Sequence, residues 1–195
     1  EGGDRSETTA AVSLSWRMGV RDQVSARTDT NTQVSELDWH HSGSYGVGGI
    51  STDARIGHDT DTGESFANGA ISYFGNRLEA TLSEDSRTEG LTNDTVSNTT
   101  TARICGGVAG SCAQGVSGRP VRGAFAIVEG HPSLKNRQIQ LGVDDDDRPH
   151  AQTGLFGPAL VPNLNPYSNE SVSFDVNNLP PGYDLGAGQL DFRAY

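Results

Sequence analysis

The sequence predicts an all-β protein, and both its composition and its pattern of apolar residues support this fold class. Only 33% of the 195 residues are hydrophobic, 25 are glycine and one is Met, so strong helix formers are few. Apolar residues instead alternate with polar ones in short segments, which are separated by Gly, Asn, Asp and Thr. A chain of this length forms one domain or two small ones.

The net charge of −11 argues against nucleic acid as a partner. The first hundred residues carry 16 acidic and 7 basic side chains, and no basic stripe is available for phosphates. We interpret the acidity as a solvated surface or a polar lumen. No apolar run of about 18 residues is present, so no transmembrane helix is expected. The opening "EGGDRSETT" lacks an initiator Met and the features of a signal peptide, which indicates a removed signal or a piece of a longer protein.

The first hundred residues contain successive strand patterns. The clearest is "AVSLSWRMG", whose alternation places two kinds of side chain on opposite faces. Its apolar face carries Val12, Leu14, Trp16 and Met18, and its polar face carries Ser13, Ser15 and Arg17. The strands that follow are "VRDQVSART", "TQVSELDWHH", "SYGVGGISTDARIGHD" and "FANGAISYFGNRLEATLSED". The third of these includes Tyr45 and Val47, with glycines that bend it, and the fourth divides into a hairpin at Gly75 and Asn76.

Two kinds of sheet fit these strands. Segments of roughly nine to eleven residues with one apolar and one polar face suit the wall of an outer-membrane barrel. The same pattern suits a soluble antiparallel sheet with one wet face, and periodicity alone does not decide between the two. If the strands lie in a membrane, they belong to a larger barrel, because an open sheet has unpaired edges.

The pattern changes near residue 117. In "GRPVRGAFAIVEG" both faces are fairly apolar, and short strands with Gly and Pro punctuation follow every eight to twelve residues or so. This sequence pattern indicates a small β-sandwich. We therefore predict two domains, residues 1–116 with the barrel-like strands and residues 117–195 with the sandwich.

No motif predicts an enzyme, a metal site or a cofactor. The acidic run Asp144 to Asp147 lacks the spaced ligands of a calcium loop and favours a solvated hairpin turn. His40 and His41 are adjacent on a strand and point to opposite faces, and His58 stands apart, so they make a poor chelate. The chain has no nucleophile elbow, and no carboxylate pair lies in a recognisable apolar pocket.

Cys105 and Cys112 have six residues between them in "CGGVAGSC". Two ligands are too few for a structural zinc site. A hairpin disulfide, which implies an oxidising compartment, and a pair of free thiols are the alternatives, and we predict the disulfide.

Three segments follow one another in the second half: "RPVRGAFAIV", a Thr-x-x-x-Gly turn, and "ALVPNLNPYSNESVSFDVNNLP". The turn residues are Thr153 and Gly157. This order of segments resembles the C-terminal part of bacterial outer-membrane fimbrial ushers of the spore-coat-U-associated, archaic type. The long segment matches that family at Ala159, Leu160, Val161, Pro162, Leu164, Pro166, Tyr167, Asn169, Val172, Asp175, Leu179 and Pro180. The resemblance covers roughly residues 100–195 well and residues 9–100 in style only.

The resemblance implies strands of an incomplete outer-membrane β-barrel followed by the first periplasmic C-terminal β-sandwich. It implies a pore and assembly platform that exports and polymerises pilus subunits without nucleotide hydrolysis, by strand exchange between subunits. The expected partners are periplasmic chaperone–pilin complexes and outer-membrane lipid, with no cofactor. The alternatives are a soluble extracellular β-sandwich binding module or adhesin fragment, and an accessory domain of a secreted carbohydrate-active enzyme.

Overall fold

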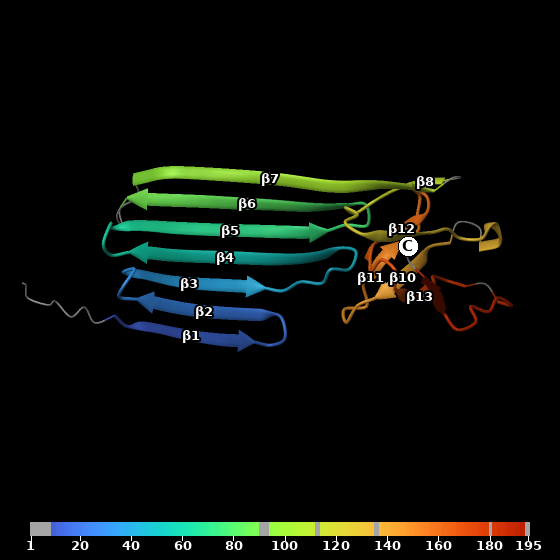
Figure 1. The fold of residues 1–195 in the computed structure, drawn as a ribbon, viewed down its shortest axis with the longest axis horizontal. Coiled ribbons are helices and arrows are strands. Elements are labelled where there is room, and N and C mark those ends of the chain that lie inside the picture. Colours follow the sequence, from blue (N-terminus) through green and yellow to red (C-terminus); the bar gives the residue numbers. More distant parts are fainter. Residues whose placement is uncertain (1–8, 90–93, 112–113, 135–136, 180, 194–195) are drawn as a thin grey trace, which may run out of the picture. The chain divides into compact units, whose positions relative to one another are not determined.

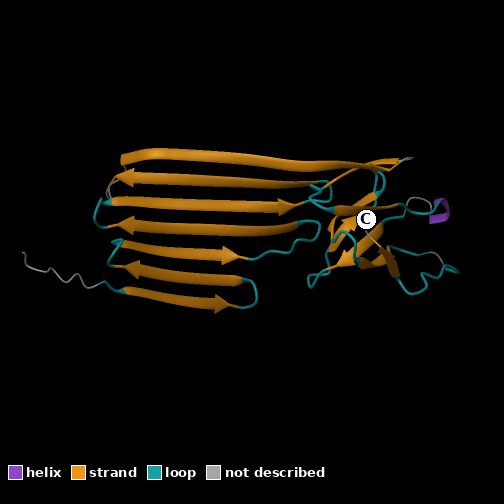
Figure 2. Cartoon of the chain, in the orientation of Figure 1, coloured by secondary structure: helices purple, strands orange, loops and turns teal. Residues whose placement is uncertain are grey.

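The computed structural model describes residues 9–89, 94–111, 114–134, 137–179 and 181–193. Apart from one short 3-10 helix, η1 (Pro132–Leu134), the elements in these residues are strands. The strands pair in antiparallel fashion, as in β1 with β2 and β10 with β13. The predicted all-β fold with antiparallel sheets is therefore confirmed (Figure 2).

The first sheet has eight strands, which occur along the sheet in the same order as in the chain (Figure 1). They are β1 (Ala11–Met18), β2 (Asp22–Asp29), β3 (Val34–His41), β4 (Gly49–Asp59), β5 (Glu64–Phe74), β6 (Leu78–Glu89), β7 (Asp94–Ser111) and β8 (Gln114–Gly118). Turns join β1 to β2, β2 to β3 and β4 to β5, as the alternating segments and turn residues predict. The hairpin expected at Gly75 and Asn76 is confirmed, since β5 ends and β6 begins on either side of it.

Two smaller sheets form the rest of the chain. One has the order β11-β10-β13-β14, and the other pairs β12 with β9. Their bounds are β9 (Ala124–Val128), β10 (Ile139–Val143), β11 (Pro149–Gln152), β12 (Ala159–Leu164), β13 (Asn169–Val176) and β14 (Gln189–Arg193). Both sheets contribute to one hydrophobic core, in which Leu141 of β10 is fully buried and packs with Ala159 and Val161 of β12.

The second face of the β12–β9 pair is covered by another part of the chain. Leu160, whose side chain is 2% exposed, forms a core cluster with Ala109 of β7 and Val116 of β8. Gly118 is required here, because a Cβ atom on it would lie 2.4 Å from Leu160 Cδ2. The alternation of Leu160 with Ala159 and Val161 thus serves two clusters, one on each face of the strand.

The chain divides into two compact units. The sheet unit comprises Glu1–Gly43, Ser51–Ile71 and Thr81–Ala102, and the C-terminal unit comprises Ser44–Ile50, Ser72–Ala80 and Arg103–Tyr195. The C-terminal unit therefore begins before the predicted boundary at residues 116 and 117. It also includes two short segments from the first half of the sequence.

Tyr45 and Val47 do not lie in a strand, in contrast to the prediction. β4 begins only at Gly49. The Val47 N–H donates to Pro149 O at 2.7 Å, and the Gly48 N–H donates to Phe74 O at 2.7 Å. These donors bind other segments of the C-terminal unit, which interrupts the ladder that alternation alone would continue.

Candidate functional site

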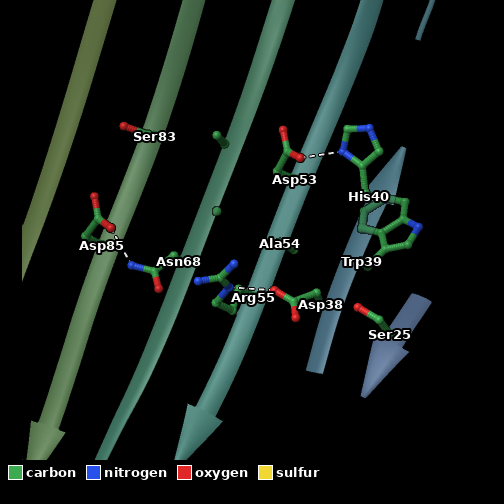
Figure 3. A pocket seen from close by; sticks show the side chains of 12 residues that line it. Ser25, Asp38, Trp39, His40, Asp53, Ala54, Arg55, Asn68, Ser83 and Asp85 are labelled. Atoms are coloured by element: carbon green, nitrogen blue, oxygen red, sulfur yellow. Dashed lines mark hydrogen bonds and ion pairs between the residues drawn. The ribbon is translucent and has the colours of Figure 1, made fainter. Parts of the chain in front are cut away.

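The polar face of the sheet unit is hollowed into an open groove of about 530 Å³ that extends over β2 to β6. Figure 3 shows three cross-strand pairs on its floor. His40 Nδ1 lies 2.5 Å from Asp53 Oδ1, and Arg55 Nε donates to Asp38 Oδ1 at 2.5 Å. Asn68 of β5 donates to Asp85 of β6. The register explains the first two pairs, since β3 and β4 place these residues directly opposite each other.

The paired side chains of the groove are largely exposed to solvent. Both members of the His40–Asp53 pair are exposed, at 51% and 61% of their side-chain surface. Exposed pairs of this kind contribute about 0–1 kcal/mol each. Acids, bases and amides alternate across the strands, so the groove presents both hydrogen-bond donors and hydrogen-bond acceptors.

The opposite face of the sheet unit is apolar and uncovered among the described residues. Strand pairing aligns its side chains in two rows that cross four strands. The rows are Trp16, Val24, Trp39 and Ala54, and Leu14, Ala26, Leu37 and Ile56. Trp16 is 69% exposed and Leu14 is 70% exposed. Contiguous apolar exposure on this scale marks a surface that binds a partner or a membrane.

A row in which three of the four side chains are polar borders these rows where β1 and β3 end. Met18, Asp22, His41 and Thr52 form the adjacent row. The Trp39 indole N–H donates to Asp22 Oδ1 at 3.3 Å, and His41 Nδ1 lies 2.9 Å from the same oxygen. Trp39 therefore has an apolar body within the rows and a polar tip at their margin, the arrangement that suits an apolar–water boundary. His40 and His41 point to opposite faces, as predicted.

Four arginines of the C-terminal unit donate to backbone carbonyls, namely Arg77, Arg119, Arg137 and Arg148. We call three of them, Arg77, Arg119 and Arg148, the arginine junction. Arg119 is 8% exposed. It donates from Nη1 to Tyr45 O at 2.6 Å and from Nη2 to His150 O. Burial lowers the pKa of Arg119, and the negative charge of Glu79 partly opposes this. A buried guanidinium with two carbonyl acceptors fixes the segment around Tyr45 against β11.

The other two arginines bind in the same way. Arg77 donates to Ser117 O and to Gly157 O, the latter at 3.1 Å. Arg148 donates to Gly48 O. Beside them, the Asn76 amide exchanges two hydrogen bonds with the backbone of Gln152, at 2.7 Å and 3.0 Å. At the end of β11, the Asn76 side-chain amide thus makes the backbone hydrogen bonds that a neighbouring strand would otherwise make.

The sequence analysis missed this junction, although one signal for it was present. The segment "YGVGG" is rich in glycine, and glycine marks places where another backbone approaches closely. A Cβ atom on Gly46 would lie 2.5 Å from Arg148 Cβ. The identity of the approaching segment was not readable, because about a hundred residues separate the two.

The acidic run forms the hairpin turn between β10 and β11, as predicted. Asp144, however, is tied to other groups. Its carboxylate accepts from the Ser44 hydroxyl, from the Asp146 N–H at 2.9 Å and from the Arg148 N–H at 3.0 Å. Burial by itself would raise the pKa of Asp144, but these hydrogen bonds outweigh it and lower the pKa to about 2.

Replacing Asp144 by Asn should weaken the C-terminal unit at neutral pH and not in strong acid. Folding lowers the pKa of Asp144 from 3.8 to about 2. The ionised carboxylate therefore stabilises the fold fully at pH values above the unfolded-state pKa, and this stabilisation is lost as the pH falls through the folded-state pKa. We expect a loss of roughly 1 kcal/mol near pH 7 that shrinks below about pH 4. Hydrogen exchange of peptides spanning residues 139–152 at matched pH values measures it. Asp145→Asn, an exposed neighbour, is the control, and an equal effect of the two variants would contradict the assignment.

The motif residues of the second half lie in separate turns and strands and do not converge on one site. Thr153 is buried, and its hydroxyl accepts from the Ile139 N–H at 2.8 Å. Gly157 has a φ of +94° in a tight turn. Pro162 lies in β12, Asn169 and Asp175 in β13, Pro166 and Tyr167 in the turn between these strands, and Leu179 beside the core. Pro180 lies outside the described residues.

The disulfide predicted between Cys105 and Cys112 stays a prediction, since Cys112 lies outside the described residues. Cys105 lies on β7, which continues to Ser111.

Among the described residues, no group of three or more His, Cys, Asp and Glu side chains is placed to hold a metal ion. The described residues also contain no helix of sufficient length and hydropathy to cross a membrane. No family model matches the sequence, and no curated protein or solved structure shows significant similarity to it.

Proposed function

We propose that this chain is part of an outer-membrane fimbrial usher, with the sheet unit forming part of the wall of a transmembrane β-barrel. The barrel is the pore and assembly platform for pilus subunits that periplasmic chaperones deliver. The two smaller sheets are the first periplasmic β-sandwich, which receives those complexes. Export proceeds without nucleotide hydrolysis, because exchange of the chaperone's strand for that of the next subunit drives it.

The observation that carries the proposal is the two-faced sheet. One face carries the exposed apolar rows that contain Trp16 and Leu37, and the other carries the charged groove around Asp38. A soluble protein would cover such rows, whereas lipid solvates them. On β1 the apolar positions extend from Val12 to Met18, about 20 Å along the strand.

The polar face supports a wide aqueous passage. A pore for folded subunits requires a wall that stays hydrated and does not hold its cargo. The pairs His40–Asp53 and Arg55–Asp38 meet both requirements, because each side chain already has a partner and still reaches solvent. The ends of the sheet order, β1 and β8, would pair with further strands of the barrel, since hydrocarbon does not tolerate unpaired strand edges.

The test uses the full-length protein in its bacterium. We expect it in the outer membrane, extractable only with detergent. Deleting its gene should abolish pilus subunits on the cell surface and leave chaperone–subunit complexes in the periplasm, and the intact gene should restore export. Unchanged surface subunits in the deletion strain would overturn the usher assignment. Recovery of the full-length protein as a detergent-independent monomer would favour a soluble adhesin module.

A further inference from the structure

A tight turn in the C-terminal unit presents two apolar side chains. Leu155 is fully exposed and Phe156 is 82% exposed. They form the tip between Gly154 and Gly157, which exchange two backbone hydrogen bonds of 3.2 Å and 3.0 Å. The φ of +94° at Gly157 lies in the region that favours glycine, so the sequence supports this geometry. The backbone hydrogen bonds therefore hold the Leu155–Phe156 tip in a defined conformation.

The turn lines a cavity of about 830 Å³, and the hairpin between β5 and β6 lines the same cavity. Tyr73 and Leu78 line it together with Leu155 and Phe156. Tyr73 follows Ile71 on the same face of β5, since residues two apart in a strand point the same way. On β6, Leu78 shares a face with Leu82, away from Asp85 of the polar groove.

The cavity also carries an uncompensated positive charge. Arg77 is the one charged residue in its lining. Its terminal nitrogens donate to the carbonyls of Ser117 and Gly157, and its buried Nε has no hydrogen-bond partner among the described residues. Carbonyl acceptors leave the guanidinium charge in place. The site therefore combines a cation with an apolar rim, which is complementary to an amphipathic anion.

We propose that Leu155, Phe156 and Arg77 form a phospholipid-binding site at the membrane surface. The Leu155–Phe156 tip enters the boundary between head groups and acyl chains, and Arg77 attracts the lipid phosphate. A bilayer fits this site, because its acyl chains lie only slightly deeper than its phosphates, and one turn can reach both. The inference rests on the proposed function, since it uses the apolar faces of β5 and β6 as lipid-facing.

The test places a fluorescent label at single cysteines of the full-length protein in nanodiscs. The background carries Cys105→Ser and Cys112→Ser, with any other cysteine also replaced, and the lipids are phosphatidylglycerol and phosphatidylethanolamine with or without brominated acyl chains. Leu155→Cys reports the turn and Leu37→Cys reports the apolar rows. Tyr167→Cys is the matched control, because this residue is also a large, exposed side chain in a turn of the C-terminal unit. Bromine should quench the label at position 155 by roughly half, as expected for shallow insertion, and leave position 167 unchanged.

The outcomes separate the two proposals. Quenching at 37 and not at 155 overturns the lipid site and leaves the barrel wall standing. Quenching at 155 and not at 37 supports a lipid-binding turn and overturns the barrel wall. Quenching at neither position overturns both, and equal quenching at 155 and 167 overturns the specific role of the turn. Arg77→Gln should lower the quenching at 155 in phosphatidylglycerol, and Arg77→Lys, which keeps the charge, should restore most of it. Equal quenching in all three proteins would remove Arg77 from the site.

Discussion

Arginine in place of Ala26 should destabilise the membrane-inserted protein by about 2–4 kcal/mol, the range for a charge near the midplane on the lipid face of a barrel. Ala26 lies between Leu14 and Leu37 in one of the apolar rows, and its side chain is exposed. In water an arginine at so open a position would cost little, because nothing has to move. The size of the destabilisation therefore shows whether lipid or water surrounds this face of the sheet.

The matched control is Ser25→Arg, one residue earlier in β2. Ser25 is on the opposite face and pairs directly with Asp38, so an arginine there meets water and a carboxylate. We expect a change within about 0.5 kcal/mol for this variant. Equilibrium unfolding of the full-length protein from lipid vesicles measures both. Similar small effects of the two arginines would exclude lipid as the solvent of the apolar face.

Replacing Arg119 by Met should cost the C-terminal unit about 2–5 kcal/mol. Methionine fills much of the same space but leaves the carbonyls of Tyr45 and His150 without their donors. Each buried unsatisfied polar group costs about 1–3 kcal/mol. Peptides that span residues 44–50 and 149–152 should lose protection in hydrogen exchange together, because one side chain serves both.

Arg122→Met is the control for this substitution. The control substitution makes the same chemical change three residues later, at an exposed position. We expect it to alter the free energy of unfolding by no more than about 0.5 kcal/mol. Arg119→Lys should give an intermediate loss, since an ammonium group keeps the charge but does not reproduce the planar fork that reaches two carbonyls. If Arg119→Met and Arg122→Met behave alike, Arg119 does not hold these segments together.

The strands of the sheet unit were predictable because alternation is a local property. Trp16 and Arg17 are adjacent and differ in polarity, so a period of two assigns their faces without knowledge of the partner strands. The opposite orientation of His40 and His41 follows from the same rule. Their partners Asp53 and Asp22 were not predictable, because pairing depends on the register that each turn sets.

The C-terminal unit was harder to predict because its decisive contacts are long-range and irregular. The segment around Tyr45 alternates like a strand, but its N–H groups bind Pro149 and Phe74 instead of a neighbouring ladder. Composition identified Asp144 as part of a turn. Its depressed pKa depends on Ser44, which is a hundred residues away in the chain. Hydrophobic periodicity contains no information about such polar contacts.

The arginine junction has a consequence for how this protein can change during evolution. Its acceptors at Tyr45, Gly48 and Gly157 are main-chain carbonyls, which every amino acid possesses. A substitution at an acceptor position therefore does not remove the acceptor, whereas a substitution of the arginine removes the donor. For the hydrogen bond itself, selection acts on the arginine only, so the donor and acceptor positions have no reason to change together. Methods that find contacts from correlated substitutions would pass over this part of the fold.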